Sequence, residues 1–253
     1  MKQYLQLLEV FTIREIKSRY KASLLGPLWI IVYPLMTTFF LSFIFQKIIK
    51  IKTEGVPYYV FLLSGLLFWN FFQQGVLLAK DSLIWNRNLV TKTTFPKEVL
   101  PLSFIFSKIP DFFINLLILL IFLISSNFKI NLLFLAIPFT IIPVVLFAAG
   151  IGLFFSLTNA IFRDFGRVIE FFLMMFFYTT PILYPESFIP KKFSFFLLYF
   201  NPIALVINFS HQILFKNQIK IELLLISLII SSFIFIFGIL FFRKFEKKIA
   251  DLI

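Results

Sequence analysis

Several ingredients of soluble enzymes are missing from this chain of 253 residues. It has no cysteine, which excludes disulfides and thiol chemistry, and its one histidine, His211, argues against a histidine-based metal site or a Ser-His triad. No glycine is followed by lysine, so no P-loop is present to cradle nucleotide phosphates. The longest hydrophilic stretches are about 20 residues, too short for a soluble catalytic domain. Catalysis by this chain alone is therefore not expected.

Apolar length is what the chain has in abundance. Hydrophobic residues make up 60% of it, and its mean hydropathy is +0.97, which predicts an integral membrane protein. The net charge of +12 arises from basic residues that cluster between the apolar runs, where they face anionic headgroups. We therefore expect a multi-pass protein of the cell (inner) membrane that contacts membrane lipids and no nucleic acid.

Six apolar stretches are candidates for crossing the hydrocarbon core, for which about 20 residues suffice. They lie at about residues 26–45, 58–78, 100–124, 132–158, 168–185 and 221–242. Two shorter pieces, 193–200 and 203–215, predict a re-entrant or interfacial hairpin on the outer side. The expected fold class is an all-α membrane protein, with an amphipathic interfacial segment at 1–25 and a transmembrane domain at 26–253.

The distribution of basic residues predicts the orientation. With Lys108 set aside as intramembrane, the six-span topology places 15 Lys and Arg residues on one side and 8 on the other. Because cytoplasmic segments carry the excess of Lys and Arg, both termini are expected in the cytoplasm. If 203–215 were a true span, the basic C-terminal tail would lie outside and this bias would weaken.

The N-terminal segment has two apolar stripes on opposite sides of a helical wheel. The first comprises Tyr4, Leu7, Leu8 and Phe11, and the second comprises Ile13, Ile16, Tyr20 and Leu24. This pattern favours two helical pieces bent near Thr12 over one straight helix. The basic residues Arg14, Lys17, Arg19 and Lys21 would then face water and headgroups. The alternative is an ordinary basic N-terminal tail.

Polar residues inside the spans indicate helix contacts or a path. The second span contains Ser64, Gly65, Trp69, Asn70, Gln73 and Gln74, which should face protein or a water-filled path. Lys108 and Asp111 are three residues apart and share a helix face, so they can pair, either at an entrance or as a purely structural pair. Ala148 and Gly152 form a small-xxx-small pair that permits close helix approach.

Residues 80–101 form the longest polar interruption between spans. Lys80, Arg87, Lys92 and Lys97 make it basic, and Leu83, Ile84, Trp85, Leu89 and Val90 give it an apolar side. We expect short surface helices here, on the cytoplasmic side. This is the segment on which a partner that drives transport is expected to dock.

Several motifs resemble those of ABC-2 type permeases that export polysaccharides. They are Arg14-Glu15-Ile16-Lys17-Ser18-Arg19-Tyr20 with Ser23-Leu24-Leu25-Gly26-Pro27-Leu28-Trp29, then Phe95-Pro96-Lys97-Glu98-Val99-Leu100-Pro101, Phe162-Arg163-Asp164-Phe165, Thr180-Pro181-Ile182-Leu183-Tyr184-Pro185 and Asn201-Pro202. They cover nearly the whole chain in the order of that family.

The resemblance implies a half-transporter. Two copies of this chain would work with two copies of a separate ATPase, which would bind ATP and Mg²⁺, and would export a polyprenyl-diphosphate-linked glycan such as O antigen, teichoic acid or capsule. The chain itself is expected to hold no cofactor and no metal. By analogy, the ATPase docking surface comprises Arg87, Lys92, Phe95, Pro96, Lys97 and Glu98. The cytoplasmic entrance, where cations meet the diphosphate, comprises Arg14, Lys17, Arg19, Arg163, Asp164 and Arg167.

The residues themselves are compatible with this function. Cations at a membrane entrance suit a diphosphate, and a sugar chain passes along aromatic faces interspersed with polar groups. The candidate path residues are Tyr33, Trp69, Phe72, Tyr178 and Tyr184. The alternative is that these rings are interfacial anchors and core packing. A two-fold homodimer would place the conduit on its axis.

Three other functions remain open from the sequence. An ABC-2 exporter of a drug or small lipid is the main alternative, because nothing in these residues reads a sugar directly. A membrane enzyme acting on polyprenyl lipids would draw on Asp111, Asp164, Glu170, Glu186 and His211, which are scattered on both sides of the membrane. A gradient-driven transporter would place ionisable residues near the midplane of its spans, where the chain has none.

Overall fold

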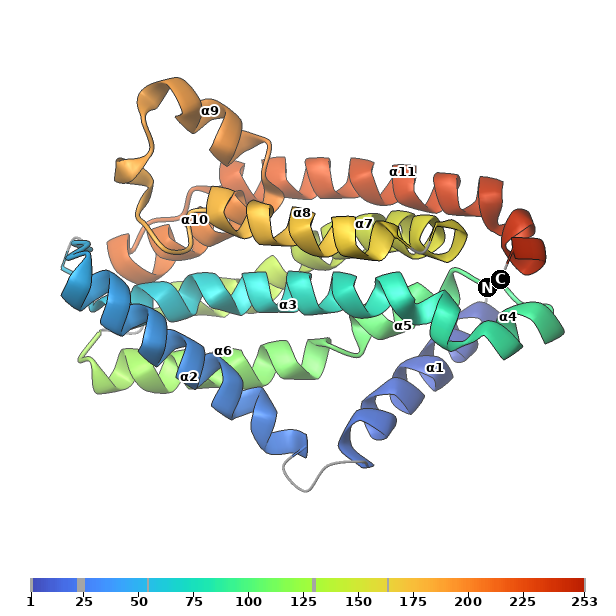
Figure 1. Cartoon of the computed structure of the whole chain (residues 1–253). Helices are drawn as coiled ribbons and strands as arrows, with labels where there is room; N and C mark the ends of the chain where they lie inside the picture. Colours follow the sequence, from blue (N-terminus) through green and yellow to red (C-terminus); the bar gives the residue numbers. More distant parts are fainter. Residues whose placement is uncertain (1, 22–25, 54, 129–130, 163, 253) are drawn as a thin grey trace.

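The computed structural model describes residues 2–21, 26–53, 55–128, 131–162 and 164–252. Within these ranges the ordered elements are helices joined by turns, without a strand. Figure 1 shows an elongated bundle whose long helices run roughly side by side. Both chain termini lie at one end, which we call the terminal end, and α9 (Lys191–Tyr199) and α10 (Pro202–Lys216) lie at the other, the distal end.

Helix α3 (Tyr58–Trp85) is the centre of the bundle. In its most apolar stretch, 78% of the residues are buried. It contacts α2 (Trp29–Ser42), α5 (Val99–Phe106), α6 (Ile109–Ser125), α7 (Ile141–Ile161), α8 (Phe165–Thr179) and α10. Its polar residues were predicted to face protein or a water-filled path. Ser64, Gly65 and Trp69 are buried in protein, whereas Asn70, Gln73 and Gln74 are half-buried and line a cleft. A continuous helix of apolar residues satisfies its own backbone hydrogen bonds, which a membrane interior requires.

The first predicted span is a composite helix on the outside of the bundle. It consists of η1 (Gly26–Leu28), α2 (Trp29–Ser42) and the π-helical η2 (Phe43–Ile48). It packs on α3 and on α6 (Ile109–Ser125), but only 17% of the residues in its most apolar stretch are buried. Large side chains such as Met36, Phe39 and Phe40 are more than half exposed and suit an apolar surrounding.

The third predicted span is interrupted. Helix α5 (Val99–Phe106) ends at a turn formed by Ser107 and Lys108, after which α6 begins at Ile109. Pro110 has no N–H to donate to the carbonyl four residues earlier, so a regular helix cannot run through this point. The interruption places Lys108 and the neighbouring Asp111 at a helix start, where their side chains meet other elements.

Two helices approach each other most closely at glycines. They are α7 (Ile141–Ile161), which follows the 3-10 helix η3 (Leu132–Thr140), and α11 (Ile221–Leu252). A Cβ atom on Gly150 or on Gly238 would collide with the backbone of the other helix. The predicted close approach at Ala148 and Gly152 is confirmed for Gly152. This glycine packs on Ala79 of α3 and Ile105 of α5, and not on α11.

The segment between α7 and α11 turns back at the distal end. Helix α8 (Phe165–Thr179) leads through η4 (Glu186–Phe188) to α9 and α10, which correspond closely to the two short apolar pieces expected there. Asn201 separates them, because its side-chain oxygen accepts hydrogen bonds from the backbone N–H groups of Ile203 and Ala204 and so caps α10.

Five helices of the described chain are long and apolar enough to cross a membrane. They are Gly26–Ile48, Tyr58–Trp85, Val99–Ser125, Leu132–Ile161 and Ile221–Glu246. These five agree with five of the six predicted spans, although α3 and α11 extend well past the predicted ends. The remaining predicted span, 168–185, contains α8, which has 15 helical residues.

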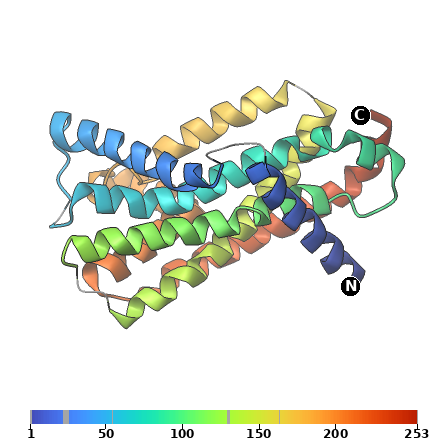
Figure 2. The same ribbon diagram turned by 90° about the horizontal axis from the view of Figure 1, so that it is seen from below.

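Helix α1 (Lys2–Lys21) lies outside the main bundle at the terminal end and packs along α5 (Figures 1 and 2). It is continuous, so the predicted break near Thr12 is wrong. The expectation that Arg14 and Arg19 face water is wrong as well, because both side chains bond to the bundle. The second half of α1 therefore packs on the bundle partly through polar groups, so it needs no continuous apolar stripe to do so. Among the described cationic side chains of this half, Lys17 alone is exposed.

Candidate functional site

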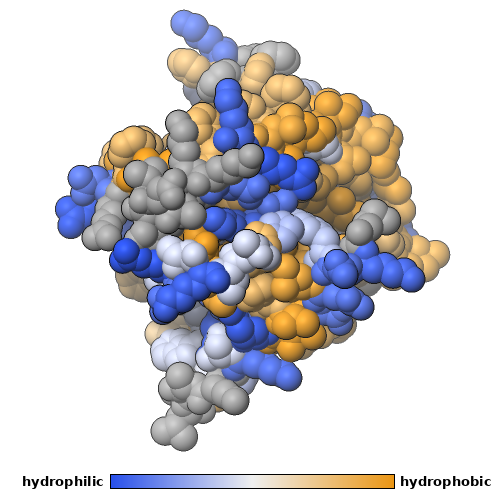
Figure 3. Space-filling model, turned by 90° about the vertical axis from the view of Figure 1, so that its right-hand side faces the viewer, coloured by the Kyte–Doolittle hydropathy of each residue, from blue (hydrophilic) through white to orange (hydrophobic). Residues whose placement is uncertain are grey.

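Polar side chains gather at the terminal end of the molecule. Figure 3 looks at this end and shows hydrophilic residues across its middle, with apolar surface at the margin. Three elements that the sequence analysis singled out meet here: α1, the segment 86–98 with α4 (Arg87–Lys92), and the start of α8. Polar groups at one end of an apolar bundle are expected to emerge at a membrane surface.

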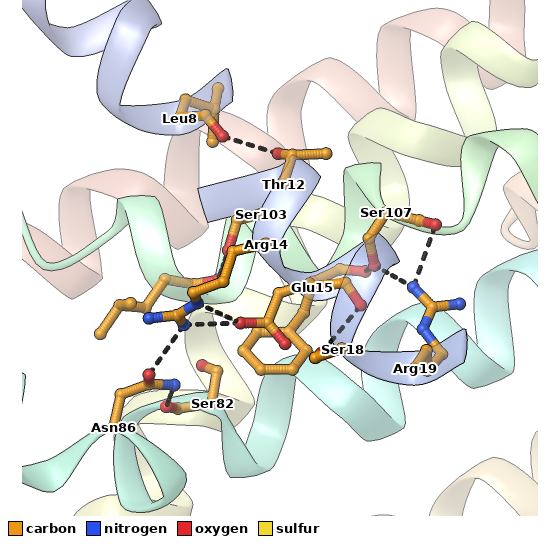
Figure 4. A network of polar contacts seen from close by, with 12 residues as sticks. Leu8, Thr12, Arg14, Glu15, Ser18, Arg19, Ser82, Asn86, Ser103 and Ser107 are labelled. Atoms are coloured by element: carbon orange, nitrogen blue, oxygen red, sulfur yellow. Dashed lines mark hydrogen bonds and ion pairs between the residues drawn. The ribbon is translucent and has the colours of Figure 1, made fainter. Parts of the chain in front are cut away.

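The middle of α1 is tied to the turn after α3. The Arg14 guanidinium donates to the Asn86 side chain over 2.8 Å and pairs with Glu15 (Figure 4). The same guanidinium lies 4.6 Å from the centroid of the Phe11 ring, and that ring stacks on Phe95 with centroids 5.8 Å apart. Helix α1 and the predicted docking surface thus form one connected unit.

One turn further on, α1 reaches the interruption between α5 and α6. The Arg19 guanidinium donates to both the backbone oxygen and the hydroxyl of Ser107 (Figure 4) and lies 3.1 Å from an Asp111 oxygen. The Lys108 ammonium lies 3.0 Å from the same oxygen and 2.8 Å from Gln74 Oε1. The predicted pairing of Lys108 with Asp111 is confirmed. Two cations share one carboxylate here, which leaves one positive charge in excess.

This ion cluster lies on the wall of a cleft of about 520 Å³ between α1, α2, α3 and α6. The lining residues are Arg19, Gly26, Trp29, Ile30, Tyr33, Pro34, Leu67, Asn70, Phe71, Gln73, Gln74, Leu77, Lys108, Asp111, Phe112 and Asn115. Within it the structure brings together Arg19, predicted at the entrance, and Tyr33, predicted on the path. We call this the α2–α6 cleft.

The lining of the α2–α6 cleft combines three kinds of side chain. It carries the cations Arg19 and Lys108, several side-chain amides, and the rings of Trp29 and Tyr33. Asn115 donates to the Asp111 carbonyl over 2.7 Å, while its own side-chain oxygen is buried and has no hydrogen-bond partner among the described residues. Such a lining can bind an anionic group at the cations and hydroxyl-rich groups at the amides and rings.

A second charged cluster holds the C-terminal part of α3 against α8. The buried Lys80 ammonium lies 2.9 Å from Glu170 and 3.1 Å from Asp81, and Asn159 of α7 donates to Asp81 and to the Lys80 carbonyl. The predicted entrance residues Asp164 and Arg167 lie beside this cluster in sequence, at the start of α8, and both are exposed. Arg163 lies outside the described residues.

The predicted docking residues are arranged at the terminal end, with differing exposure. Arg87, Lys92 and Pro96 are exposed, whereas Phe95 and Lys97 are half-buried. Glu98 is only 3% exposed, and its carboxylate accepts two hydrogen bonds from Arg243 of α11. Burial, followed by the negative charge of Glu98, raises the pKa of the Tyr4 phenol above its ordinary value. Glu98 therefore connects the start of α5 to α11.

The predicted path residues fall into two groups. Trp69 and Phe72 are buried in the core, where they contact Phe176 and Phe177 of α8 and Phe147 of α7. Tyr33 and Tyr178 are at least half exposed, and the Tyr184 hydroxyl donates to the Tyr178 carbonyl. Only the exposed rings are accessible from the surface of a single copy.

Sequence reasoning missed the long-range polar contacts of the site. It marked Asn70, Gln73 and Gln74 as facing protein or a path, and the i, i+4 spacing of Asn70 and Gln74 already places them on one face. It did not identify Asn86, Ser107 or Asn115, or the partners of Glu98 and Lys80. Among the described residues, no group of three or more His, Cys, Asp or Glu side chains is placed to hold a metal ion.

An apolar helical bundle with five helices able to cross a membrane and a polar terminal end defines the class of the protein as an integral membrane protein. The family model for ABC-2 type transporters matches residues 6–215. The chain therefore belongs to the ABC-2 type transporter family and is a transmembrane component of a transporter.

Two groups of relatives are similar over most of their length. An O-antigen export system permease protein from Klebsiella pneumoniae is 33% identical over 248 residues, which are 98% of this chain and 95% of the relative. A protein of the same name from Myxococcus xanthus is 26% identical over 86% of this chain and 83% of its own length. A polysialic acid transport protein from Escherichia coli is 26% identical over 84% and 82% of the two chains.

Proposed function

We propose that this chain is the transmembrane permease subunit of an ATP-driven exporter that moves a polyprenyl-diphosphate-linked polysaccharide out of the cytoplasm. O antigen, teichoic acid and capsule are the candidate glycans. The observation that carries this proposal is 33% identity to an O-antigen export permease over 98% of the chain. The relatives in polysialic acid transport agree with it. Together they favour a glycan over a drug or small lipid.

In this proposal both termini are cytoplasmic and α8 makes the sixth crossing. An odd number of crossings would put the termini on opposite sides of the membrane, whereas Figure 1 has them at one end. The 15 residues of α8 span about 22 Å at 1.5 Å per residue, and the turn that follows carries the chain further toward the distal end. The α9–α10 hairpin is then re-entrant or interfacial on the outer side.

The energy source in this proposal is a separate ATPase, two copies of which join two copies of this chain. The absence of a P-loop in the sequence supports a separate motor. Large exposed apolar side chains on α2 and α8, such as Phe40 and Phe171, offer surface for a second copy as well as for lipid. Arg87, Lys92 and Pro96 supply the most accessible part of the docking surface.

The α2–α6 cleft is the part of the site that we assign to substrate. Arg19 and Lys108 would attract the diphosphate, and the amides and aromatic rings would contact the first sugars. Arg167 would act in the same way at the start of α8. Arg19 and Lys108 together carry one positive charge more than Asp111 neutralises. This excess supports the assignment, because an anion can pair with it while Asp111 keeps a cationic partner.

Charge reversal at the docking surface should weaken association with the ATPase. Replacing Arg87 or Lys92 by glutamate is expected to reduce co-purification of the ATPase by about tenfold, the effect of about 1.4 kcal/mol, because rim charges favour binding to a surface of opposite sign. Lys192→Glu is the matched control, since Lys192 is an exposed cation at the distal end. Equal loss in the control, or no loss in either docking variant, would remove the docking assignment.

Arg19→Gln should lower export more than it lowers stability. Asp111 keeps Lys108 as a partner in this variant, so assembly should persist, while the cleft loses one of its two cations. We expect export of the glycan to fall by about tenfold, a charge-assisted hydrogen bond contributing about 1.5–3 kcal/mol. Quantified cell-surface glycan and co-purified ATPase measure the two effects. Lys2→Gln, at an exposed cation in the first turn of α1 and outside the cleft, is the control and should export normally.

Deletion of this chain tests the function itself. A glycan exporter's loss should strand the complete lipid-linked polymer in the cytoplasm, where extraction and gel analysis will detect it, and restoring the chain should return polymer to the surface. An exporter of a drug or small lipid would instead leave the surface glycan unchanged. Unchanged surface glycan, with no polymer accumulating inside, would overturn the proposed function.

A further inference from the structure

A second cleft, of about 510 Å³, lies at the distal end and shares no lining residue with the α2–α6 cleft. It is formed where α10 and the turn 181–189 meet the start of α3 and the loop before it. Its lining residues are Thr53, Val56, Phe61, Pro181, Pro185, Glu186, Ser187, Ile189, Leu198, Ile207, Asn208, His211, Gln212, Phe215 and Lys216. We call it the distal cleft. None of the residues predicted for docking, entrance or path lines it.

A chain of polar side chains runs along one wall of the distal cleft. Gln212 donates to the Asn208 side chain over 3.1 Å, and Asn208 donates to Glu186 over 2.6 Å. Gln212 is only 5% exposed, and no described residue donates a hydrogen bond to its side-chain oxygen. A buried acceptor without a hydrogen-bond donor destabilises the folded protein. Because Gln212 lines the cleft, a ligand with a hydroxyl group could supply the missing donor.

Three aromatic rings in mutual contact form the other wall. His211 lies between Phe61 and Phe215, with ring centroids 4.6 and 5.1 Å away. Its Nε2 atom is 2.8 Å from the hydroxyl of Ser64, a buried residue of α3, which fixes the orientation of the imidazole. The rings are therefore held rigidly against the central helix and offer a mostly apolar surface.

We propose that the distal cleft is a saccharide subsite, which holds one or two sugar units of the exported glycan on the outer side. This inference rests on the proposed function. Sugar hydroxyls would donate to Gln212 Oε1 and to the Glu186 carboxylate, and the apolar face of a sugar ring would pack on the aromatic wall. Polar groups that converge beside an apolar wall are the usual composition of a small-ligand site.

The charge of the lining determines the ligand class. Glu186 is a carboxylate, Gln212 presents an oxygen, and Lys216 is the one cation among the lining residues. An anion such as a phosphate would have to approach Glu186 with no second cation to offset it, which is unfavourable. Neutral sugars, which are rich in hydroxyl donors, fit these acceptors.

The experiment uses the absence of cysteine from the chain. A single cysteine at the exposed Ser187, on the rim of the distal cleft, is introduced into the complete transporter reconstituted in nanodiscs. Its reaction with a hydrophilic maleimide is followed with and without oligosaccharide released from the exported polymer by mild acid. Saturating oligosaccharide should slow modification of the Ser187→Cys variant, while a control cysteine at the exposed Gln218 outside the cleft should react at an unchanged rate.

A second substitution connects the protection to the unpartnered acceptor. Adding Gln212→Leu should raise the oligosaccharide concentration for half-protection by about tenfold, because one hydrogen bond to a buried group is lost. Gln212→Glu, which keeps an acceptor oxygen, should retain protection. Absence of protection in the Ser187→Cys variant alone overturns the subsite, as does protection that Gln212→Leu leaves unchanged.

Failure of the subsite can be distinguished from failure of the proposed function. If deleting the chain strands polymer in the cytoplasm but the oligosaccharide of that polymer does not protect the cysteine at position 187, the exporter stands and the distal subsite is wrong. If deletion leaves the polymer at the surface, the proposed function itself is wrong, and the subsite as a site for the exported glycan falls with it.

Discussion

Replacing Asp111 by alanine should destabilise the protein by about 3–5 kcal/mol, the usual cost of leaving a buried charge without its partner. The Asp111 side chain is 13% exposed and is the shared partner of Lys108 and Arg19. Its removal leaves two cations facing each other across the cleft at the α5–α6 interruption. Thermal unfolding of the chain in nanodiscs, followed by circular dichroism, measures the loss.

Lys108→Met is the sharpest comparison, because it removes a cation from the same cluster. Asp111 then keeps Arg19, and the main loss is the donor to Gln74 Oε1, so we expect a cost of only about 1–2 kcal/mol. Asp164→Ala, at an exposed carboxylate, should have almost no effect. Equal destabilisation by Asp111→Ala and Lys108→Met would contradict the shared-carboxylate arrangement.

Gly238→Ala should be the most damaging addition of a single methyl group. The new Cβ would collide with the carbonyl oxygen of Gly150, a backbone atom that cannot rotate away, so α7 and α11 must separate. Overpacking of this kind costs about 1–3 kcal/mol, and more where neighbouring backbones must move. Because α11 packs on α7 along much of its length, the separation would also weaken contacts far from the glycine.

Gly75→Ala provides the matched control for that prediction. A Cβ atom on Gly75 of α3 would meet Ile105 at 3.7 Å, an ordinary van der Waals contact. Alanine is favoured over glycine in a helix by about 1 kcal/mol, so this variant should be as stable as the parent or more stable. Thermal unfolding of both variants under the same conditions decides the matter; a Gly238→Ala protein that melts with the parent would exclude the close helix contact.

Local sequence patterns predicted the parts of the site that depend on neighbouring residues. Lys108 and Asp111 lie three residues apart, so one helical turn is enough to bring them together, and the structure confirms the pair. The predicted division between the two short apolar pieces is local as well, because Asn201 caps α10 through residues two and three positions away. Similar reasoning failed for α1, because apolar periodicity cannot identify a helix face that is buried by polar contacts.

Long-range pairs could not be predicted in the same way. Arg243 and Glu98 are 145 positions apart, Arg19 and Asp111 are 92 apart, and Lys80 and Glu170 are 90 apart. Each pair forms because separate helices pack at a particular distance and rotation. In a single sequence, every arginine or lysine near a span end is an equally good partner for every carboxylate.

The sequence by itself determined that this is a membrane protein, where most of its spans lie and which family its motifs resemble, because hydrophobic length and short motifs are local properties of the chain. Only the tertiary structure decided that Arg14 and Arg19 turn into the protein, that Glu98 is buried against α11, and that one cleft opens between α1, α2, α3 and α6 and another at the distal end. These features depend on how helices far apart in sequence pack together. A cleft is the space left between packed elements, and it exists only once their positions relative to one another are set.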